Sequence, residues 1–394
     1  MKKSFIYLMT ALAGCVSVFL LSSCDDDSSN GSSAFDLSSI VDDTKYSENA
    51  TNWGSYMVAV AQRLKADATT LYNDWNTSYN GGNAYKDLFT NPALGEFTSA
   101  RAAAEQIIDG CIDIANEVGT AKIGDPRSLY NAGKYEEAVY AVESWYSYHS
   151  RDDYKNNINS IRNAYFGSLD GSRSATSLSA FVSAAGTTGQ QLDTKVQSAI
   201  SSAISAIDAI PQPFRNNIGA GEVVTAMEAC AALNNVLTNE LKPFVTNASN
   251  ISEANLQTVI NDYTDKVVLP TYLSLKNENE TLLDLAQQFK ASPSDAAFEA
   301  LAAQWIKARK YWESSEAFLF GPVADKGLDP NMDSWPLDKD QIMQILSSGD
   351  FSGLDWTGEY NEESDDIAAA QGIRGFHTLE FLIFKNGEAR RITD

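Results

Sequence analysis

One histidine and one glutamate near the end of the chain have the spacing of a pair that can hold a metal ion. The segment Gly375–Glu380 reads GFHTLE, and an apolar run, FLIF, follows it. On a helix, His377 and Glu380 stand at i and i+3 and share a face. An imidazole and a carboxylate so placed can both bind one ion. Gly375 lacks a Cβ, so a second backbone or a ligand can come close. A buried histidine that pairs with its own carboxylate for structural reasons fits the same spacing.

A second segment, WIKARKYWESSE, places charged side chains inside an apolar helical pattern. Arg309 and Glu316 are seven residues apart, so two helical turns bring them to one face. Trp305 and Trp312 lie along the same stripe. An arginine can hold a carboxylate or an anionic chelate through two parallel hydrogen bonds. The alternative is a solvated surface on which Arg309 pairs with Glu313, four residues further on.

A third segment, ESWYSYHSRDD, mixes acids, serines and aromatic residues. Glu143 and Ser147 share a helix face at i and i+4, and His149 is close to them in sequence. In the alternative interpretation, the residues from Ser147 to Asp153 end one helix and cap the next.

Composition restricts the function. The 394 residues hold 52 acidic against 29 basic side chains, a formal net charge of −23, with 44% hydrophobic residues. This is a globular composition, and such an acidic surface repels phosphate backbones, which excludes nucleic acid as a partner. The two histidines, His149 and His377, exclude a zinc protease of the HExxH type, which needs two on one helix plus a further ligand.

The first 23 residues have the pattern of an export signal. Lys2 and Lys3 precede an apolar run over 5–21, and Leu-Ser-Ser-Cys ends at Cys24. This resembles a bacterial lipoprotein signal peptide (1–23), which implies cleavage before Cys24 and lipidation of its thiol. An uncleaved transmembrane anchor is the alternative, at the short limit of roughly 17–25 residues for a spanning helix. We expect a flexible tether over 24–45 and a cell-envelope location, as an outer-membrane lipoprotein that faces the periplasm or the cell surface.

The rest of the chain predicts helices almost throughout. Apolar residues recur every three or four positions over the ranges 51–77, 96–118, 135–148, 154–166, 192–210, 221–245, 254–289 and 295–319. The range 254–289 includes Pro270, where we expect a bend. The stretch 320–366 is irregular, with one short helix expected at 339–346. Cys111 and Cys230 lie in apolar helical patterns, which fits buried free thiols, although an exported protein could join them in a disulfide.

These patterns predict an all-α fold built of two helical bundles. We place the first over 46–250, with an exchange of helices between the two allowed, and the second over 251–394, which carries the Gly375–Glu380 motif.

The dispersed motifs together resemble the imelysin-like family. GFHTLEFLIF is similar to that family's GxHxxE signature, and Trp305, Arg309 and Glu316 to its W…R…E helix. The segment DSWPL, which contains Trp335, resembles its WPL segment, and Glu143, Ser147 and Asp153 resemble its E…FS…D stretch. The matches run from about residue 143 to 384.

The order of these motifs differs from most of the family. GxHxxE here follows the E…FS…D stretch and comes 14 residues before the end of the chain, which resembles the circularly permuted subset. Because permutation is tolerated where termini lie close together, we expect residue 394 and the region near residue 45 to be neighbours.

The resemblance implies two four-helix bundles with a site at their interface and a role in iron uptake. His377, Glu380, Glu316 and Glu143 would meet around one point, with Arg309 beside them and Trp335 as a wall. Oxygen ligands with one imidazole suit iron better than zinc, and haem with His377 as axial ligand is a further candidate. The implied partners are an iron species or haem, a membrane through the lipid anchor and an iron-transport component.

Two other functions remain open at this stage. The family was once grouped with metallopeptidases, but a hydrolytic zinc site needs three protein ligands and a general base. His377 and Glu380 supply two ligands, and His149 could be a third only if the fold brings it close. A structural or adhesive surface lipoprotein without a small ligand is the other alternative.

Overall fold

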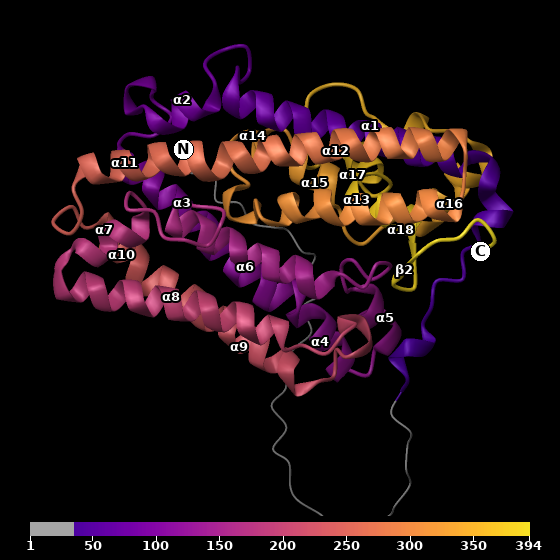
Figure 1. Ribbon diagram of the computed structural model, residues 1–394, viewed down its shortest axis with the longest axis horizontal. Helices are drawn as coiled ribbons and strands as arrows, with labels where there is room; N and C mark the ends of the chain where they lie inside the picture. The colour runs from indigo at the N-terminus through magenta and orange to yellow at the C-terminus, as the bar shows by residue number, and fades with distance from the viewer. Residues whose placement is uncertain (1–34) are drawn as a thin grey trace, which may run out of the picture. The chain divides into compact units, whose positions relative to one another are not determined.

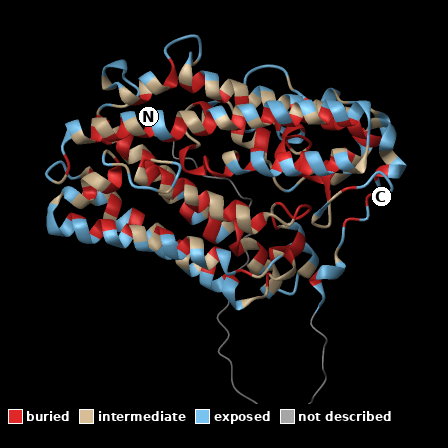
Figure 2. Ribbon diagram, in the orientation of Figure 1, coloured by how far each residue is buried: buried red, intermediate tan, exposed pale blue. Residues whose placement is uncertain are grey.

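Long amphipathic helices make up most of the structure, a computed structural model that describes residues 35–394. In α1, residues such as Met57, Val60, Leu64 and Leu71 recur at helical spacing and are buried. Figure 2 shows the same division into buried and exposed faces along the other long helices. The longer helices are α1 (Tyr46–Asn76), α3 (Ala100–Glu117), α6 (Ser150–Phe166), α8 (Gly186–Asp208), α9 (Gly221–Val236), α11 (Glu253–Tyr263), α12 (Leu269–Ala291), α13 (Asp295–Glu313) and α16 (Lys339–Ser348).

Shorter elements connect these helices. The short α-helices are α2 (Tyr85–Thr90), α4 (Gly124–Asn131), α5 (Tyr135–Tyr140), α7 (Leu178–Ala184), α10 (Lys242–Thr246), α14 (Pro322–Asp325), α15 (Leu328–Asp333), α17 (Asp365–Gln371) and α18 (Gly375–Ile383). The 3₁₀ turns are η1 (Leu37–Ser39), η2 (Pro92–Leu94), η4 (Phe214–Asn216), η7 (Glu316–Phe318) and η8 (Ser352–Leu354). A two-stranded antiparallel hairpin follows α18, with β1 (Phe384–Lys385) paired to β2 (Glu388–Ala389). Apart from this hairpin, the regular elements of residues 35–394 are helices, which confirms the predicted all-α class.

Three π-helical turns interrupt the long helices: η3 (Val118–Lys122), η5 (Leu237–Leu241) and η6 (Thr264–Val268). The helix predicted over 254–289 is thus α11, η6 and α12 in succession. Pro270 stands in the first turn of α12, directly after the π turn. Proline cannot donate a backbone hydrogen bond, and the widened turn before it accommodates that loss.

Two groups of helices pack side by side along their lengths. In one group α1 lies along α12 and also contacts α16 and α18, while α12 packs on α13 (Figure 1). In the other, α8 contacts α6, α7 and α9, and α3 contacts α6 and α9. The groups meet where α13 packs on α6, and where η7 contacts α3 and α6. The predicted bundle boundary at residue 250 stays a prediction.

The C-terminus lies next to the start of α1, as the sequence predicted. The Ser47 amide donates to the Asp394 carbonyl at 2.8 Å. The buried Arg390 donates to the Thr44 carbonyl at 3.0 Å and to the Asp42 carboxylate, so it fixes the segment before α1. This proximity is what a circular permutation requires; the permutation itself stays a prediction.

Three sequence-based predictions of helices were wrong. The helix expected over 295–319 starts at Asp295, with Ser294 as its N-cap, but ends at Glu313 because a 3₁₀ turn follows. The helix expected over 135–148 ends at Tyr140, and turns replace its second half. The irregular stretch 320–366 holds α14 and α15 besides the expected α16, since short helices leave too weak a period to recognise.

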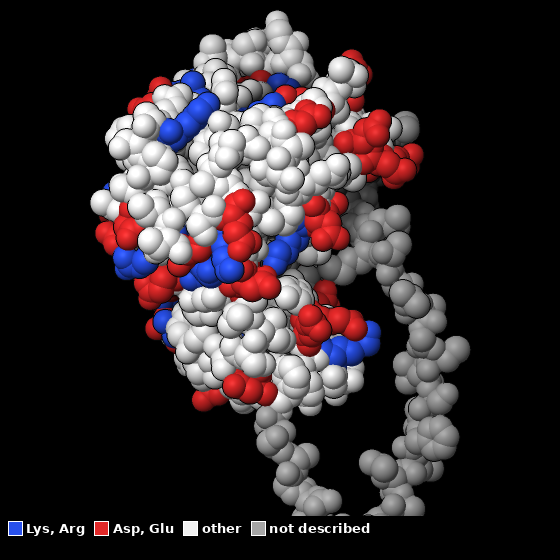
Figure 3. All heavy atoms as spheres, turned by 90° about the vertical axis from the view of Figure 1, so that its right-hand side faces the viewer, with Lys and Arg blue, Asp and Glu red and all other residues white. Residues whose placement is uncertain are grey.

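The two cysteines outside the leader are buried free thiols, which confirms one of the two alternatives. Cys24 and the predicted signal peptide lie outside the described residues. Among residues 35–394, no helix has the length and apolar character needed to cross a membrane. Figure 3 shows acidic side chains in several groups on one face, with basic side chains beside some of them.

Candidate functional site

A glycine sets the position of α18 against α15. Gly375 has φ +88°, and a Cβ there would stand 2.5 Å from the Met332 carbonyl oxygen. Only glycine allows this approach. The sequence prediction of a close backbone contact at this residue is thereby confirmed. The contact brings His377, on α18, next to Asp333, the last residue of α15.

The His377 imidazole is fully buried between two carboxylates. Its Nε2 lies 3.1 Å from Asp333 Oδ1, and its Nδ1 lies 3.0 Å from Glu380 Oε2. The Trp335 ring covers it, with the ring centroids 4.8 Å apart. Burial and the nearby Arg309 would lower the pKa of His377, but the hydrogen bonds to Asp333 and Glu380 raise it to about 9. The imidazole is therefore a charged donor to both carboxylates at neutral pH.

The second oxygen of Glu380 is held by the turn between α5 and α6. The amide and the hydroxyl of Ser147 both donate to Glu380 Oε1 at 2.8 Å. Ser144 and Tyr148 have φ of +52° and +63°, conformations that non-glycine residues rarely adopt. This turn also directs the Ser144 hydroxyl to Asp153 Oδ2 at 2.6 Å. A strained backbone of this kind is typical of functional segments.

Arg309 stands at the centre of the buried charges. Its guanidinium forms a close ion pair with Asp333, lies 2.6 Å from Glu313 Oε1 without hydrogen-bond geometry, and lies 3.6 Å from Asp153 Oδ2. It also lies over the Phe376 ring, 5.5 Å from the centroid. Burial would lower the pKa of Arg309, but the three carboxylates raise it well above its usual value. Arg309 is therefore an internal counter-ion for several acids.

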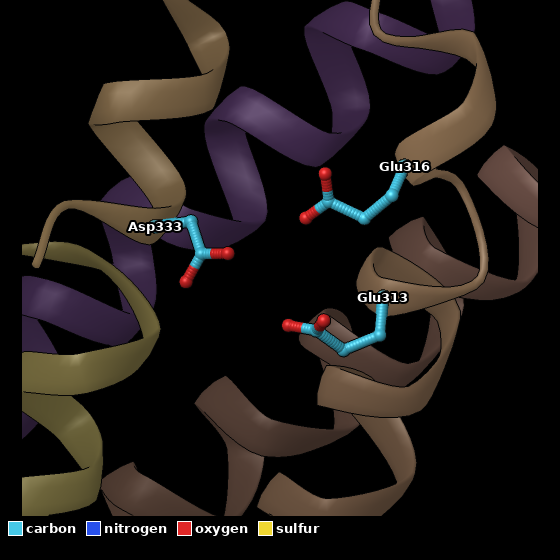
Figure 4. A group of neighbouring side chains, drawn as sticks. All are labelled: Glu313, Glu316 and Asp333. Carbon is cyan, nitrogen blue, oxygen red and sulfur yellow. The ribbon is translucent and has the colours of Figure 1, made fainter. Parts of the chain in front are cut away.

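Three of the carboxylates form a compact cluster. Oxygen atoms of Glu313, Glu316 and Asp333 lie within 4.8 Å of one another, and Figure 4 shows the side chains pointing toward a common space. Asp333 accepts from the Trp312 indole at 2.6 Å, and Glu313 accepts from the Asn157 amide. Among the described residues, Glu313 Oε1 is buried without a hydrogen-bond partner. Oxygen atoms spaced like this can bind one cation together.

The three carboxylates differ in how readily they release a proton. Burial raises the pKa of Glu313 to about 8 and raises the pKa of Glu316 well above its usual value, although neighbouring cations oppose both shifts. Burial would also raise the pKa of Asp333, but Arg309 and His377 hold it well below its usual range. The raised pKa values of Glu313 and Glu316 mean that a cation bound here would compete with protons for these two carboxylates.

A lysine completes the surroundings of the cluster. Lys122, in the π-helical turn η3, is buried, and its Nζ lies 3.1 Å from Glu143 Oε2 and 3.6 Å from Glu117 Oε1. Burial would lower the pKa of Lys122, but Glu143, Glu316 and Glu117 raise it well above its usual value. Lys122 is therefore a second internal cation, between Glu143 and the carboxylate cluster.

Most of the residues expected in the site are brought together. Asp153, Ser147, Glu380, His377, Trp335 and Arg309 form one connected network. Glu316 lies in the carboxylate cluster, but not through a shared face with Arg309, because α13 ends before it. The pairing of Arg309 with Glu313 does occur, but it is buried and not solvated.

One expected site residue, Glu143, lies elsewhere. Glu143 binds Lys122 and does not join His377, because the backbone turns after α5 instead of continuing as a helix. Ser147 does not cap α6, since its hydroxyl is taken by Glu380. His149 Nδ1 lies 2.9 Å from the Ser147 carbonyl oxygen, and its ring packs near Trp305, so it is no part of the carboxylate cluster.

Comparison with known proteins identifies the family of the chain. The chain matches the imelysin family over residues 30–239 and 268–394, most of its length. The chain belongs to the imelysin family. The crystal structure of an imelysin peptidase from Bacteroides ovatus is 54% identical; the match covers 89% of this chain and 99% of that one, with a TM-score of 0.86.

A curated relative carries an iron-related name. Iron-regulated protein A of Synechococcus elongatus is 28% identical over 167 residues, which are 42% of this chain and 37% of that protein. The match therefore spans well under half of that relative. The imelysin family and this relative are compatible with an iron-related role for the chain.

The sequence patterns missed three residues of this candidate site. Asp333 begins the DSWPL segment, and an acid that directly precedes a matched motif was a usable signal. Glu313 was seen only as a surface partner of Arg309, although the tryptophans around it pointed to burial. Lys122 gave no signal, because a single lysine in an amphipathic pattern is usually solvated.

The ligand types of the cluster fit some metal groups better than others. Three carboxylates offer hard oxygen ligands, which suit iron and other hard cations better than zinc. A haem iron needs a free imidazole nitrogen, but both nitrogens of His377 contact carboxylates and the ring is fully buried. The residues present therefore fit an iron ion and do not fit haem.

Proposed function

We propose that this imelysin-family protein binds an iron ion at the carboxylates of Glu313, Glu316 and Asp333, and that it serves iron uptake at the bacterial cell envelope. The observation that carries this proposal is the cluster itself, in which oxygen atoms of Glu313, Glu316 and Asp333 lie within 4.8 Å of one another in the interior. Carboxylates that lie this close together in the interior can ionise only at a cost of several kcal/mol per ion in effective terms. A bound cation removes that cost, which supports a binding role over a purely structural one.

The second support is the balance of charge. Seven buried or half-buried acids surround two permanent cations, Arg309 and Lys122, together with the protonated His377; the acids are Glu117, Glu143, Asp153, Glu313, Glu316, Asp333 and Glu380. Proteins compensate buried charge by pairing, by protonation or by metal binding. A divalent or trivalent cation would displace protons from these acids and compensate the charge of the resulting carboxylates.

A metal titration tests the iron site. Calorimetry with ferrous ion under anaerobic conditions, and with ferric ion, should give saturable binding to the purified chain. Glu316→Gln removes a charged ligand and should weaken binding by more than the roughly 10–100-fold that loss of an outer partner costs. His377→Ala removes a group that orients Asp333 without belonging to the cluster. This substitution should weaken iron binding by roughly 10–100-fold.

Glu222→Gln is the matched control, since Glu222 is exposed at the start of α9. It should leave binding unchanged. Absence of saturable binding, or binding that Glu316→Gln leaves untouched, contradicts the proposal. Tighter binding of zinc than of ferric ion would contradict the choice of metal, because ferric ion is the harder cation.

The envelope location is part of the same proposal and rests on the sequence alone. Labelled palmitate fed to cells that express the chain should enter the protein, and Cys24→Ala should abolish the label. Incorporation that Cys24→Ala leaves intact would contradict lipidation at this cysteine.

The geometry offers less support for peptide hydrolysis. Both His377 nitrogens contact carboxylates, and His149 faces the Ser147 carbonyl, so these side chains do not form a three-ligand site with an open position. Cleavage of unfolded protein that chelators stop and that His377→Ala abolishes would favour the peptidase instead.

A further inference from the structure

A small pocket lies outside the carboxylate cluster and shares none of its three acids. Arg63, Ala66 and Asp67 of α1 line one wall, Asn331 of α15 and Arg374 line another, and Asp355 and Trp356 come from the loop after η8. Its volume is about 240 Å³. The space is open to solvent on one side and large enough for a small organic ion.

Two arginines of the pocket are anchored from behind. Arg63 donates to the Ala59 carbonyl at 2.9 Å, and Arg374 donates to the Leu354 carbonyl at 3.2 Å and pairs with Asp67. These contacts fix both guanidinium groups before any ligand arrives. Preorganised arginines are the usual means of binding carboxylates through paired hydrogen bonds.

Arg374 keeps unused binding capacity. Its side chain is 5% exposed, and its Nε has no hydrogen-bond partner within the described residues. A buried donor without a partner is costly, and such atoms commonly mark a missing ligand or water. The guanidinium also lies 5.5 Å from the Trp356 ring centroid, so an aromatic face borders the same space.

Asp355 occupies the position between the two arginines. It accepts from Arg63 Nε at 2.8 Å and from a second nitrogen of the same guanidinium, while Arg374 Nη1 lies 3.9 Å from its Oδ1. Unlike the other charged groups of the pocket, its side chain is 59% exposed and stands on a loop. Without Asp355 the pocket would hold two arginines against one half-buried acid, Asp67, so it would carry a net positive charge.

We propose that this pocket binds a small organic carboxylate, which replaces Asp355 at the two arginines. The ligand carboxylate bonds to Arg63 and to the free Nε of Arg374, and its remaining atoms lie against Trp356. Asp355 acts as a resident competitor that swings toward solvent when the ligand binds. This inference stands apart from the iron site, so its test uses the chain with no iron added.

The test measures binding of succinate by calorimetry at low ionic strength, with succinamide as the uncharged probe of the same shape. Succinate should bind saturably and succinamide should not. Arg63→Met should weaken succinate binding by roughly tenfold or more, as loss of a charged hydrogen bond does. Asp355→Asn removes the competing charge and should tighten binding several-fold. Trp356→Phe should remove a succinate-dependent change in tryptophan fluorescence.

Lys134→Met is the matched control, because it removes one exposed positive charge far from the pocket in sequence. It should leave succinate binding unchanged, and circular dichroism should show that every variant keeps its helices. Four results would overturn the proposal. They are no saturable binding to either the native chain or Asp355→Asn, equal binding to Arg63→Met, equal binding of succinamide, and binding of phosphate without binding of succinate.

Discussion

The buried cations of the site act by orienting acids. The Asp333 carboxylate accepts hydrogen bonds from the Arg309 guanidinium, the His377 imidazole and the Trp312 indole. These three donors fix its orientation. Glu380 is held in the same way by His377 and by the amide and hydroxyl of Ser147. Charge-assisted hydrogen bonds of this kind are shorter and stronger than neutral ones. His377 of the GxHxxE motif therefore orients Asp333. Neither His377 nor Glu380 belongs to the cluster of Glu313, Glu316 and Asp333.

Arg309→Met should destabilise the chain strongly. The substitution leaves Asp333, Glu313 and Asp153 buried without their shared counter-ion, and breaking a buried pair costs about 3–5 kcal/mol. Urea unfolding followed by circular dichroism measures the change. Lys45→Met is the control, because the Lys45–Glu48 pair is exposed and surface pairs contribute about 0–1 kcal/mol. Equal effects of the two substitutions would contradict this role for Arg309.

Among the elements, the junction of α15 and α18 matters most for the site. It depends on the close approach of Gly375 to the Met332 carbonyl, which puts Asp333 beside His377. A second close contact lies at α3, where a Cβ at Gly110 would stand 2.1 Å from the Ala317 carbonyl oxygen of η7. Gly110 thus allows α3 to approach η7, and Gly375 allows α18 to approach α15.

Gly375→Ala should therefore cost more than an ordinary glycine substitution. A non-glycine residue at positive φ loses roughly 1–2 kcal/mol, and overpacking against Met332 adds typically about 1–3 kcal/mol. Gly133→Ala is the matched control, since Gly133 has φ +75° with no atom within 4 Å of its would-be Cβ. Thermal unfolding of both variants gives the difference. Similar losses in the two would show that the contact at Gly375 is unimportant.

For the whole molecule, residues 36–394 form one compact unit with the site in its interior. The site draws on α6, α13, α15 and α18 and on the turn before α6, so its protonation affects the stability of the entire unit. The net charge of −23 adds repulsion between surface acids as pH rises. The molecule combines an acidic exterior with an acidic interior site.

Stability without metal should fall as pH rises from about 5 to 9. The pKa of Glu313 is raised to about 8, so the folded state retains a proton that the unfolded chain releases above about pH 4.5. The pKa of His377 is raised to about 9. Its contribution to the stability of the folded state is complete below about pH 6.5 and is lost as the pH rises through 9. Asp333, with its lowered pKa, loses its contribution only in strong acid.

Urea midpoints at several pH values measure this profile. Glu313→Gln should flatten the part between about pH 5 and 8, because the amide does not titrate. A profile that rises steadily across the whole range, or one that Glu313→Gln leaves unchanged, would contradict these shifts.

The sequence by itself determined the all-α class, the positions of the long helices and the pairing of His377 with Glu380. Each of these depends on residues a few positions apart, whose geometry a regular helix fixes. The tertiary structure alone decided that Asp333 and Glu313 belong to the site. It also decided that Lys122 forms an ion pair with Glu143, and that Ser147, in the turn before α6, donates to Glu380. Those contacts join distant segments through irregular backbone, for which local spacing carries no information.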